Sequence, residues 1–107
     1  MTIYEALADP TRRRILDLLR ERPYMVGELV EALGQSQPLV SKHLRVLREV
    51  GLVSVRQDAQ RRWYELRPEP LAELDEWLKP FRQRMEARYD RLQQLLDEMQ
   101  QEEREDG

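Results

Sequence analysis

Residues 34–52, GQSQPLVSKHLRVLREVGL, place hydrogen-bonding and basic side chains at helical spacing. The polar stripe has hydrogen-bonding groups near its start and positive charge further along: Gln37, Ser41, Arg45 and Arg48, with Lys42 beside it. Such a helix can present side chains to base edges and to phosphates when it lies in a major groove. The pattern therefore predicts recognition of double-stranded DNA.

The boundaries of this helix carry their own signals. Ser36 can cap the N-terminus with its side-chain oxygen, and Pro38 lies in the first turn, where its missing N–H does no harm. Gly51 can end the helix in a left-handed conformation. The remaining stripe is apolar and consists of Val40, Leu44, Leu47 and Val50. We therefore expect one face to pack on a core and the other to face DNA.

Composition excludes several classes of function. The 107 residues suit one domain, and the absence of cysteine excludes disulfides and thiolate metal sites. A single histidine excludes a multi-histidine metal site within one chain. With no catalytic constellation and no glycine-rich phosphate loop, we expect neither an enzyme nor a cofactor. No apolar run could span a membrane and no signal-peptide pattern is present, so we expect a cytoplasmic protein without membrane contact.

The net charge of −3 conceals an uneven distribution. Residues 1–68 hold 12 Lys and Arg against 9 Asp and Glu, whereas residues 69–107 hold 6 against 12. Within residues 36–67, 7 basic side chains face 3 acidic ones. This asymmetry is typical of an electropositive binding surface joined to an acidic helix.

Three shorter helices are predicted ahead of residue 34. Residues 3–8 could form one turn and a half, after which Asp9 caps and Pro10 opens a helix over about 10–22. A third helix over about 25–33 ends at Gly34. Together with residues 37–50 it forms a helix-turn-helix candidate.

Beyond residue 51 the periodicity changes to two. Apolar and polar side chains alternate over residues 53–56 and 61–66, which flank a turn at residues 58–60. This β-hairpin could simply complete the core, or it could contact DNA as a wing. Its position directly after the DNA-reading helix favours DNA contact.

A long helix with a nearly heptad apolar seam follows the connector at residues 67–70. The seam consists of Leu71, Leu74, Leu78, Phe81, Met85, Tyr89, Leu92, Leu96 and Met99. Pro80 lies within it, and because the seam continues on both sides we expect one kinked helix rather than two. Residues 100–107 lack apolar partners, so we expect an acidic, disordered tail.

So continuous an apolar face cannot be covered by the small domain alone. A second copy of the chain is the simplest partner, and a homodimer would also present two reading helices to two half-sites. The alternative is an intramolecular hairpin with the N-terminal helix, which is short for that purpose. We expect three segments: a DNA-binding domain over residues 1–68, a dimerisation helix over 69–99 in the same structural unit, and the tail.

Three stretches resemble the ArsR/SmtB family of winged-helix repressors. ALADPTRRRIL at 6–16 is similar to the opening helices of the family, and residues 27–53 are similar to its helix-turn-helix, including Ser-x-His-Leu at 41–44. RRWYELRPEPLAELDEWL at 61–78 is similar to the second wing strand and final helix of a subgroup without the classical metal-binding motifs. The implied fold is mainly α (α+β winged helix-turn-helix), with a two-stranded wing and a long C-terminal helix.

The resemblance implies a dimeric repressor that binds an inverted-repeat operator and blocks transcription. The implied base-reading residues are Gln37, Pro38, Ser41 and Lys42. The DNA-backbone contacts expected from the residues and the resemblance are Thr11, Arg12, Ser36, Arg45, Arg56, Arg61 and Arg62. The dimer interface, packed through the first and last helices, would comprise Ile3, Tyr4, Leu71, Leu74, Leu78, Phe81, Met85, Tyr89, Leu92 and Leu96.

The chain departs from the family pattern at two metal sites and at the wing. Residues 26–31, VGELVE, hold no thiolate where the family commonly has a pair, and the final helix offers only carboxylates such as Asp75, Glu86 and Asp90. We therefore expect no metal sensing at the known sites of the family. Ala59 and Gln60 replace a common Gly-Arg at the wing tip, which argues against deep minor-groove insertion.

Some alternatives stay open at this level. His43 could read a base or sense pH, but its place beside the apolar stripe favours a structural role. The run Arg12–Arg14 could be solvated or bind phosphate, and Trp77 with Phe81 and Tyr89 could line a pocket or simply pack. A different class of function is a protein–protein interaction module, in which the acidic helix binds another factor.

Overall fold

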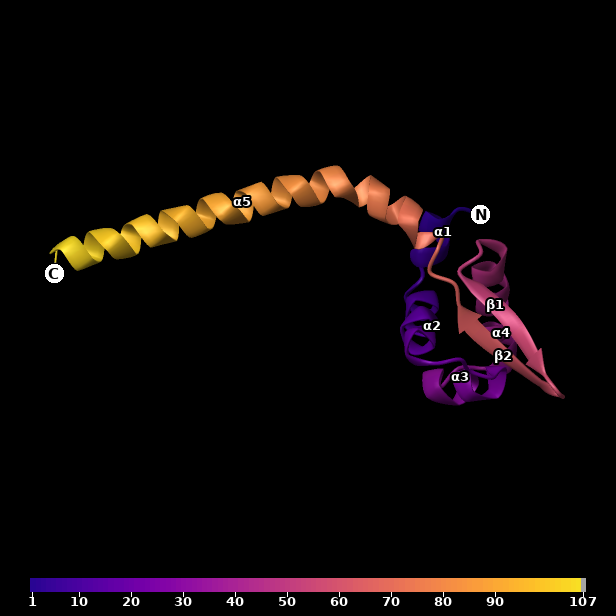
Figure 1. Cartoon of the computed structure of the whole chain (residues 1–107). Helices are drawn as coiled ribbons and strands as arrows, with labels where there is room; N and C mark the ends of the chain where they lie inside the picture. Colours follow the sequence, from indigo (N-terminus) through magenta and orange to yellow (C-terminus); the bar gives the residue numbers. More distant parts are fainter. Residues whose placement is uncertain (107) are drawn as a thin grey trace. The chain divides into compact units, whose positions relative to one another are not determined.

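The computed structural model describes residues 1–106 and is mainly helical, with one two-stranded antiparallel sheet (Figure 1). The elements in chain order are α1 (Ile3–Leu7), α2 (Pro10–Glu21), α3 (Val26–Leu33), α4 (Gln37–Glu49), β1 (Val53–Asp58), β2 (Arg61–Leu66) and α5 (Leu71–Asp106). This order of helices followed by a hairpin and a long helix confirms the predicted winged helix-turn-helix class. The chain divides into a first compact unit, Met1–Leu74, and a second one that begins at Asp75.

Side-chain caps start the helices at the predicted places. The Asp9 carboxylate accepts hydrogen bonds from the amides of Thr11 (2.8 Å) and Arg12 (3.1 Å), and Pro10 is the first residue of α2. The Ser36 hydroxyl accepts one from the Leu39 amide (3.4 Å) at the start of α4. These bonds satisfy amide donors that have no partner within the helix.

Two glycines in the left-handed conformation end α3 and α4. Gly34 has φ 65° and Gly51 has φ 79°. At the end of α4, the Gly51 amide donates to the Arg48 carbonyl (3.1 Å) and the Leu52 amide donates to the Leu47 carbonyl (2.9 Å). This pair of bonds is a Schellman motif, which turns the chain from the helix into the hairpin.

The core of the first unit lies among α2, α3, α4 and the base of the hairpin. Its fully buried large side chains are Ile15, Leu29, Val40, Leu44, Leu47 and Leu52. Each helix contributes residues spaced three or four apart, as the apolar stripes predict. The unit extends to Leu74 rather than ending near residue 68, because Leu71 packs against this core.

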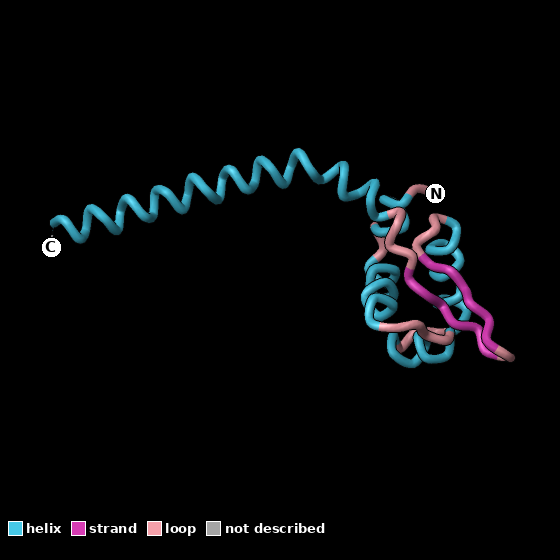
Figure 2. Tube along the Cα trace, in the orientation of Figure 1, coloured by secondary structure: helices cyan, strands magenta, loops and turns pink. Residues whose placement is uncertain are grey.

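The hairpin pairs Val53 with Leu66 and Asp58 with Arg61, leaving Ala59 and Gln60 in the turn. A bridge between Tyr24 and Tyr64 (N–O distances of 3.1 and 2.7 Å) joins β2 to the segment before α3. The tip of the hairpin extends past the helices in Figure 2. Its base is therefore fixed to the core, while the side chains of its tip are exposed.

One helix, α5, runs from Leu71 through Pro80 to Asp106, so the prediction of a single helix is confirmed. The expectation that residues 100–107 are disordered is not met over 100–106, which continue the helix; Gly107 lies outside the described residues. Gln, Glu and Arg are good helix formers, and lengthening an existing helix costs little compared with starting one. Over the described residues, no helix is long and apolar enough to cross a membrane.

We predict that Gly51→Ala lowers the free energy of unfolding by about 1–2 kcal/mol, because an L side chain at positive φ is strained. The built Cβ would lie 3.5 Å from Pro70 Cγ, which is ordinary contact, so strain and not a clash sets the cost. Chemical denaturation at fixed protein concentration measures the change. Gly27→Ala is the matched control, since Gly27 lies in α3 with open space around it. This variant should be about 0.5–1 kcal/mol more stable than wild type, because alanine favours a helix over glycine. Equal effects at both positions would contradict the argument.

Candidate nucleic-acid interface

The outer face of α4 presents the predicted base-reading residues together. Gln37, Pro38, Ser41 and Lys42 are all exposed, as are Arg45 and Arg48 one and two turns further along. The opposite face of the same helix is buried through Val40, Leu44 and Leu47. Since residues four apart lie above one another on a helix, Gln37, Ser41 and Arg45 form one solvent-facing row.

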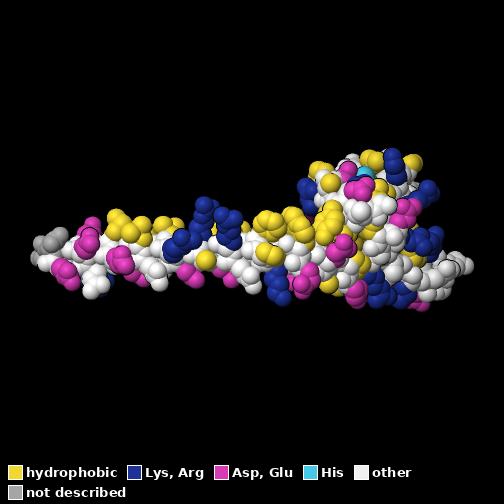
Figure 3. All heavy atoms as spheres, turned by 90° about the horizontal axis from the view of Figure 1, so that it is seen from above, with side chains coloured by type: hydrophobic (Ala, Val, Ile, Leu, Met, Phe, Trp, Pro, Cys, Tyr) yellow, Lys and Arg dark blue, Asp and Glu magenta, His cyan; other side chains and the backbone are white. Residues whose placement is uncertain are grey.

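The charge distribution of the surface agrees with the sequence. In Figure 3, Lys and Arg side chains gather over the winged unit and over the middle of α5, whereas Asp and Glu predominate toward the C-terminal end of α5. A positive surface around α4 and the hairpin suits a phosphate backbone, which supplies most of the sequence-independent attraction to DNA.

Within the hairpin, the three predicted arginines differ. Arg56 Nε donates to Glu65 Oε1 at 2.6 Å, and this bond raises the pKa of Arg56 above its usual value. Part of the charge of Arg56 is thereby neutralised inside the wing. Arg61 and Arg62 are exposed at the start of β2, next to the tip, and as neighbours on a strand they point to opposite faces.

Arg12 and Arg13 are bonded within the protein, which sequence reasoning missed. Arg12 Nε donates to the Ala6 carbonyl (2.7 Å), and its Nη2 donates to the Glu5 carbonyl (3.0 Å). Arg13 Nη1 donates to the Leu7 carbonyl (2.7 Å). Both guanidinium groups therefore bind carbonyls at the C-terminal end of α1, where the helix dipole favours a cation. The repeated arginines after a short helix were the available signal.

Thr11 also makes a contact inside the protein. Its hydroxyl accepts a hydrogen bond from Gln35 Nε2 (3.2 Å), which ties the start of α2 to the turn between α3 and α4. Gln35 Oε1 is buried without a hydrogen-bond partner among the residues described. The turn that positions Ser36 and the first turn of α4 is thus held from α2.

His43 lies on the buried side of α4, with 8% of its surface exposed. Its Nδ1 is 3.5 Å from Arg12 Nη1. Because arginine can only donate, this contact is a hydrogen bond when Nδ1 carries no proton. This placement favours the structural role over base reading.

The ionisation of the Asp9 carboxylate depends on its capping hydrogen bonds. Burial opposes its ionisation, but the amide bonds from Arg12 and Thr11, with the nearby charge of Arg12, outweigh it and lower the pKa of Asp9. The carboxylate is therefore charged at the start of α2, where the helix dipole favours an anion.

The predicted dimer-interface residues differ in how much of each side chain is exposed. Ile3 is buried in its own chain, so it does not offer free surface, while Tyr4 is 40% exposed. Leu71, Leu74 and Leu78 are half-buried. The exposed apolar face of α5 comprises Trp77, Phe81, Met85, Tyr89, Leu92, Leu95, Leu96 and Met99. The Trp77 and Phe81 rings lie 4.8 Å apart and pack on each other within the helix.

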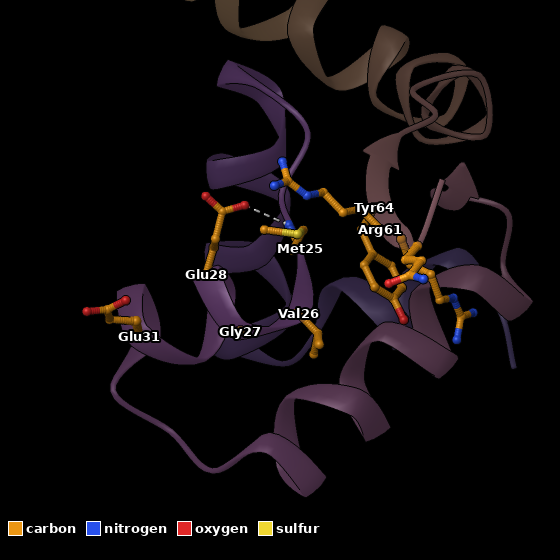
Figure 4. Close-up of a pocket in the computed structure, with 9 residues that line it drawn as sticks. Met25, Val26, Gly27, Glu28, Glu31, Arg61 and Tyr64 are labelled. Atoms are coloured by element: carbon orange, nitrogen blue, oxygen red, sulfur yellow. Dashed lines mark hydrogen bonds between the residues drawn. The ribbon is translucent and has the colours of Figure 1, made fainter. Parts of the chain in front are cut away.

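A groove of about 670 Å³ lies between α3 and β2 (Figure 4). Met25 and Val26 line one side and Tyr64 lines the other. Glu28 accepts bonds from the Met25 amide (2.9 Å) and from Arg22 Nη2 (3.1 Å), which lower its pKa. Over residues 1–106, no three His, Cys, Asp or Glu side chains are grouped so that they could hold a metal ion.

A buried stripe and an exposed polar row on α4, followed by a hairpin with exposed arginines, define a winged helix-turn-helix DNA-binding protein. The chain belongs to the arsR family of bacterial regulatory proteins, whose sequence profile matches residues 9–55. The members of this family are transcriptional regulators, so this chain is a transcriptional regulator and not an enzyme.

Individual relatives agree with this assignment. The HTH-type transcriptional regulator Rv2034 of Mycobacterium tuberculosis is 48% identical over 71 residues, which span 66% of this chain and 66% of that protein, just under two thirds. The transcriptional repressor SdpR of Bacillus subtilis is 33% identical over 79 residues, covering 74% of this chain and 88% of that protein. The homodimeric winged helix-turn-helix DNA-binding domain of Mb0332 from Mycobacterium bovis is 30% identical, with a TM-score of 0.59, over 74% of this chain and 73% of that one.

We predict that Asp9→Asn reduces the pH dependence of stability. A carboxylate whose pKa is lowered on folding stabilises the protein above its ordinary value of 3.8, and this stabilisation is lost as the pH falls through the lower folded value. Wild type should therefore exceed Asp9→Asn in stability at about pH 7, and the two should converge near about pH 2. Denaturant unfolding at each pH measures this. Asp17→Asn, which removes an exposed carboxylate of the same helix, is the control; equal behaviour of both variants would contradict the prediction.

Proposed function

We propose that the protein is a cytoplasmic, dimeric repressor that occupies an inverted-repeat operator. In this proposal α4 enters the major groove with Gln37, Pro38, Ser41 and Lys42 at the bases. Ser36, Arg45, Arg61 and Arg62 contact the DNA backbone. Arg56 and Thr11 contribute less to these contacts, because each already has a hydrogen-bond partner in the protein. The observation that carries the proposal is the division of α4 into a buried apolar face and an exposed polar one.

The dimer is inferred from the exposed apolar face of α5. Eight large apolar side chains of this helix are at least 45% exposed, an arrangement that a helix stable in water normally covers with a partner. A second copy is the occupant we propose, because the Mb0332 domain is described as homodimeric and because two reading helices match two half-sites. In the dimer, α5 pairs with α5 of the partner.

Repression would not be relieved by a metal ion at the known sites of the family. Residues 26–31 supply no soft ligand, and the carboxylates of α5 are not grouped for metal binding over the described residues. The signal that releases DNA would be a small organic ligand, a partner protein or the concentration of the repressor itself.

The DNA test starts from a random-sequence duplex library, from which the preferred site is selected and then titrated against a scrambled duplex. We predict that Ser41→Ala and Lys42→Ala each cost about 1–3 kcal/mol of specific binding and relax the preference at one position. Lys79→Ala removes an exposed lysine of α5 that pairs with Glu76 and should bind like wild type. If wild type shows no sequence preference and the α4 variants bind unchanged, the chain is instead an interaction module.

The dimer test uses sedimentation equilibrium. We predict that Leu92→Glu and Leu96→Glu shift the protein toward monomer by at least about tenfold in dissociation constant, because each places a charge in an apolar interface. Gln94→Glu adds the same charge between these two positions on another side of the helix and is the control. A wild-type monomer at micromolar concentration, or equal effects of all three variants, would contradict the α5 interface.

A further inference from the structure

One guanidinium joins three helices of the first unit. Arg12 belongs to α2, its Nε and Nη2 bind the Ala6 and Glu5 carbonyls of α1, and its Nη1 lies 3.5 Å from His43 Nδ1 of α4. The planar fork of arginine can direct donors to several acceptors at once. These contacts lie within the same compact unit as the DNA-reading helix.

At the α1 end, Arg12 binds the Ala6 carbonyl and gives the Glu5 carbonyl a second donor beside the Ala8 amide (3.2 Å). α1 has only five residues, so carbonyls at its C-terminal end, such as that of Ala6, lie beyond the reach of its own amides. Ile3 and Ala6 of α1 are buried in the core, which places α1 against the unit. Arg12 then fixes where the C-terminal end of α1 lies relative to α2.

At the α4 end, the contact reaches the middle of the reading helix from its buried side. His43 directly follows Ser41 and Lys42 in the chain, and it is buried whereas they are exposed. A change in the position of His43 therefore moves the two side chains proposed to read bases. Val40 and Leu44 hold the same turn by packing, so Arg12 supplies the polar and directional part of its attachment.

We propose that Arg12 is a positioning residue that links α1 to the DNA-reading helix, and that it does not bind phosphate. The inference rests on the proposed function, since it concerns how α4 is set for DNA. In this arrangement, a displacement of α1 also shifts Arg12 and His43, and through them the exposed side chains of Ser41 and Lys42. Any molecule that rearranges α1 can thereby alter operator affinity without touching α4.

Substitution by lysine separates the two roles of Arg12. Lysine keeps a positive charge that can serve a phosphate, but its single ammonium cannot reproduce the planar set of donors. Arg12→Gln removes the charge as well. Arg13→Lys is the matched control, because Arg13 is the next residue and its bond goes to the Leu7 carbonyl of α1, with no contact to α4 among the bonds described.

Binding is measured for selected and scrambled duplexes across a salt series. We expect Arg12→Lys to lose about tenfold in affinity for the selected duplex, a typical coupling between contacting residues, with an unchanged salt slope and unchanged scrambled binding. If Arg12 instead contacts a phosphate of the DNA, the opposite result is expected. Arg12→Lys would bind like wild type, and Arg12→Gln would weaken both duplexes and reduce the slope by about 0.9. That outcome would overturn the proposal.

A second readout does not need DNA. His43 is the single histidine of the chain, so its ring nitrogen signals are unambiguous in an NMR spectrum. Arg12→Lys should shift the Nδ1 signal and weaken amide-exchange protection in α1, whereas Arg13→Lys should leave Nδ1 in place. His43→Asn, which keeps an acceptor, should bind the selected duplex better than His43→Leu. An unchanged Nδ1 signal in folded Arg12→Lys would overturn the link even if the proposed function fails.

Discussion

The structure depends on the burial of one face of α4. Val40, Leu44 and Leu47 are inserted among α2, α3 and the base of the hairpin, and each is at most 1% exposed. Because a helix is rigid, fixing this stripe also fixes the direction of every residue on the opposite side. The polar row of α4 needs no contacts of its own to be held outward, so its side chains stay available to bind DNA.

Around that packing, polar contacts adjust the position of the helix. The Schellman motif at Gly51 sets where α4 ends and the hairpin begins, and the Gln35–Thr11 bond holds the turn before it. Arg12 adds a third attachment from the buried side. Each single bond contributes modestly to stability, but together they leave α4 little freedom to rotate or slide. The exposed face of α4 is thus held in one orientation by the rest of the unit.

Electrostatics divides the chain into two parts with different tasks. A net charge of −3 would discourage binding to DNA if it were spread evenly. Of the 21 acidic residues, 12 instead lie in residues 69–107, whereas residues 36–67 carry 7 basic side chains against 3 acidic ones. Since attraction to phosphate is short-ranged in physiological salt, the charge near the point of contact governs binding more than the net charge of the chain does.

By itself, the sequence determined the helices, their caps, the hairpin and the two faces of α4, because these features follow from local periodicity and from side chains such as Asp9, Ser36 and Gly51 that act on neighbouring backbone. It could not assign Arg12 and Arg13, whose partners lie in another helix, nor show that Ile3 is already buried. It also misjudged residues 100–106, where helix propagation extends beyond the apolar seam. Only the tertiary structure decided which basic side chains are bonded within the protein, because the fold brings the guanidinium groups of Arg12 and Arg13 to the carbonyl end of another helix.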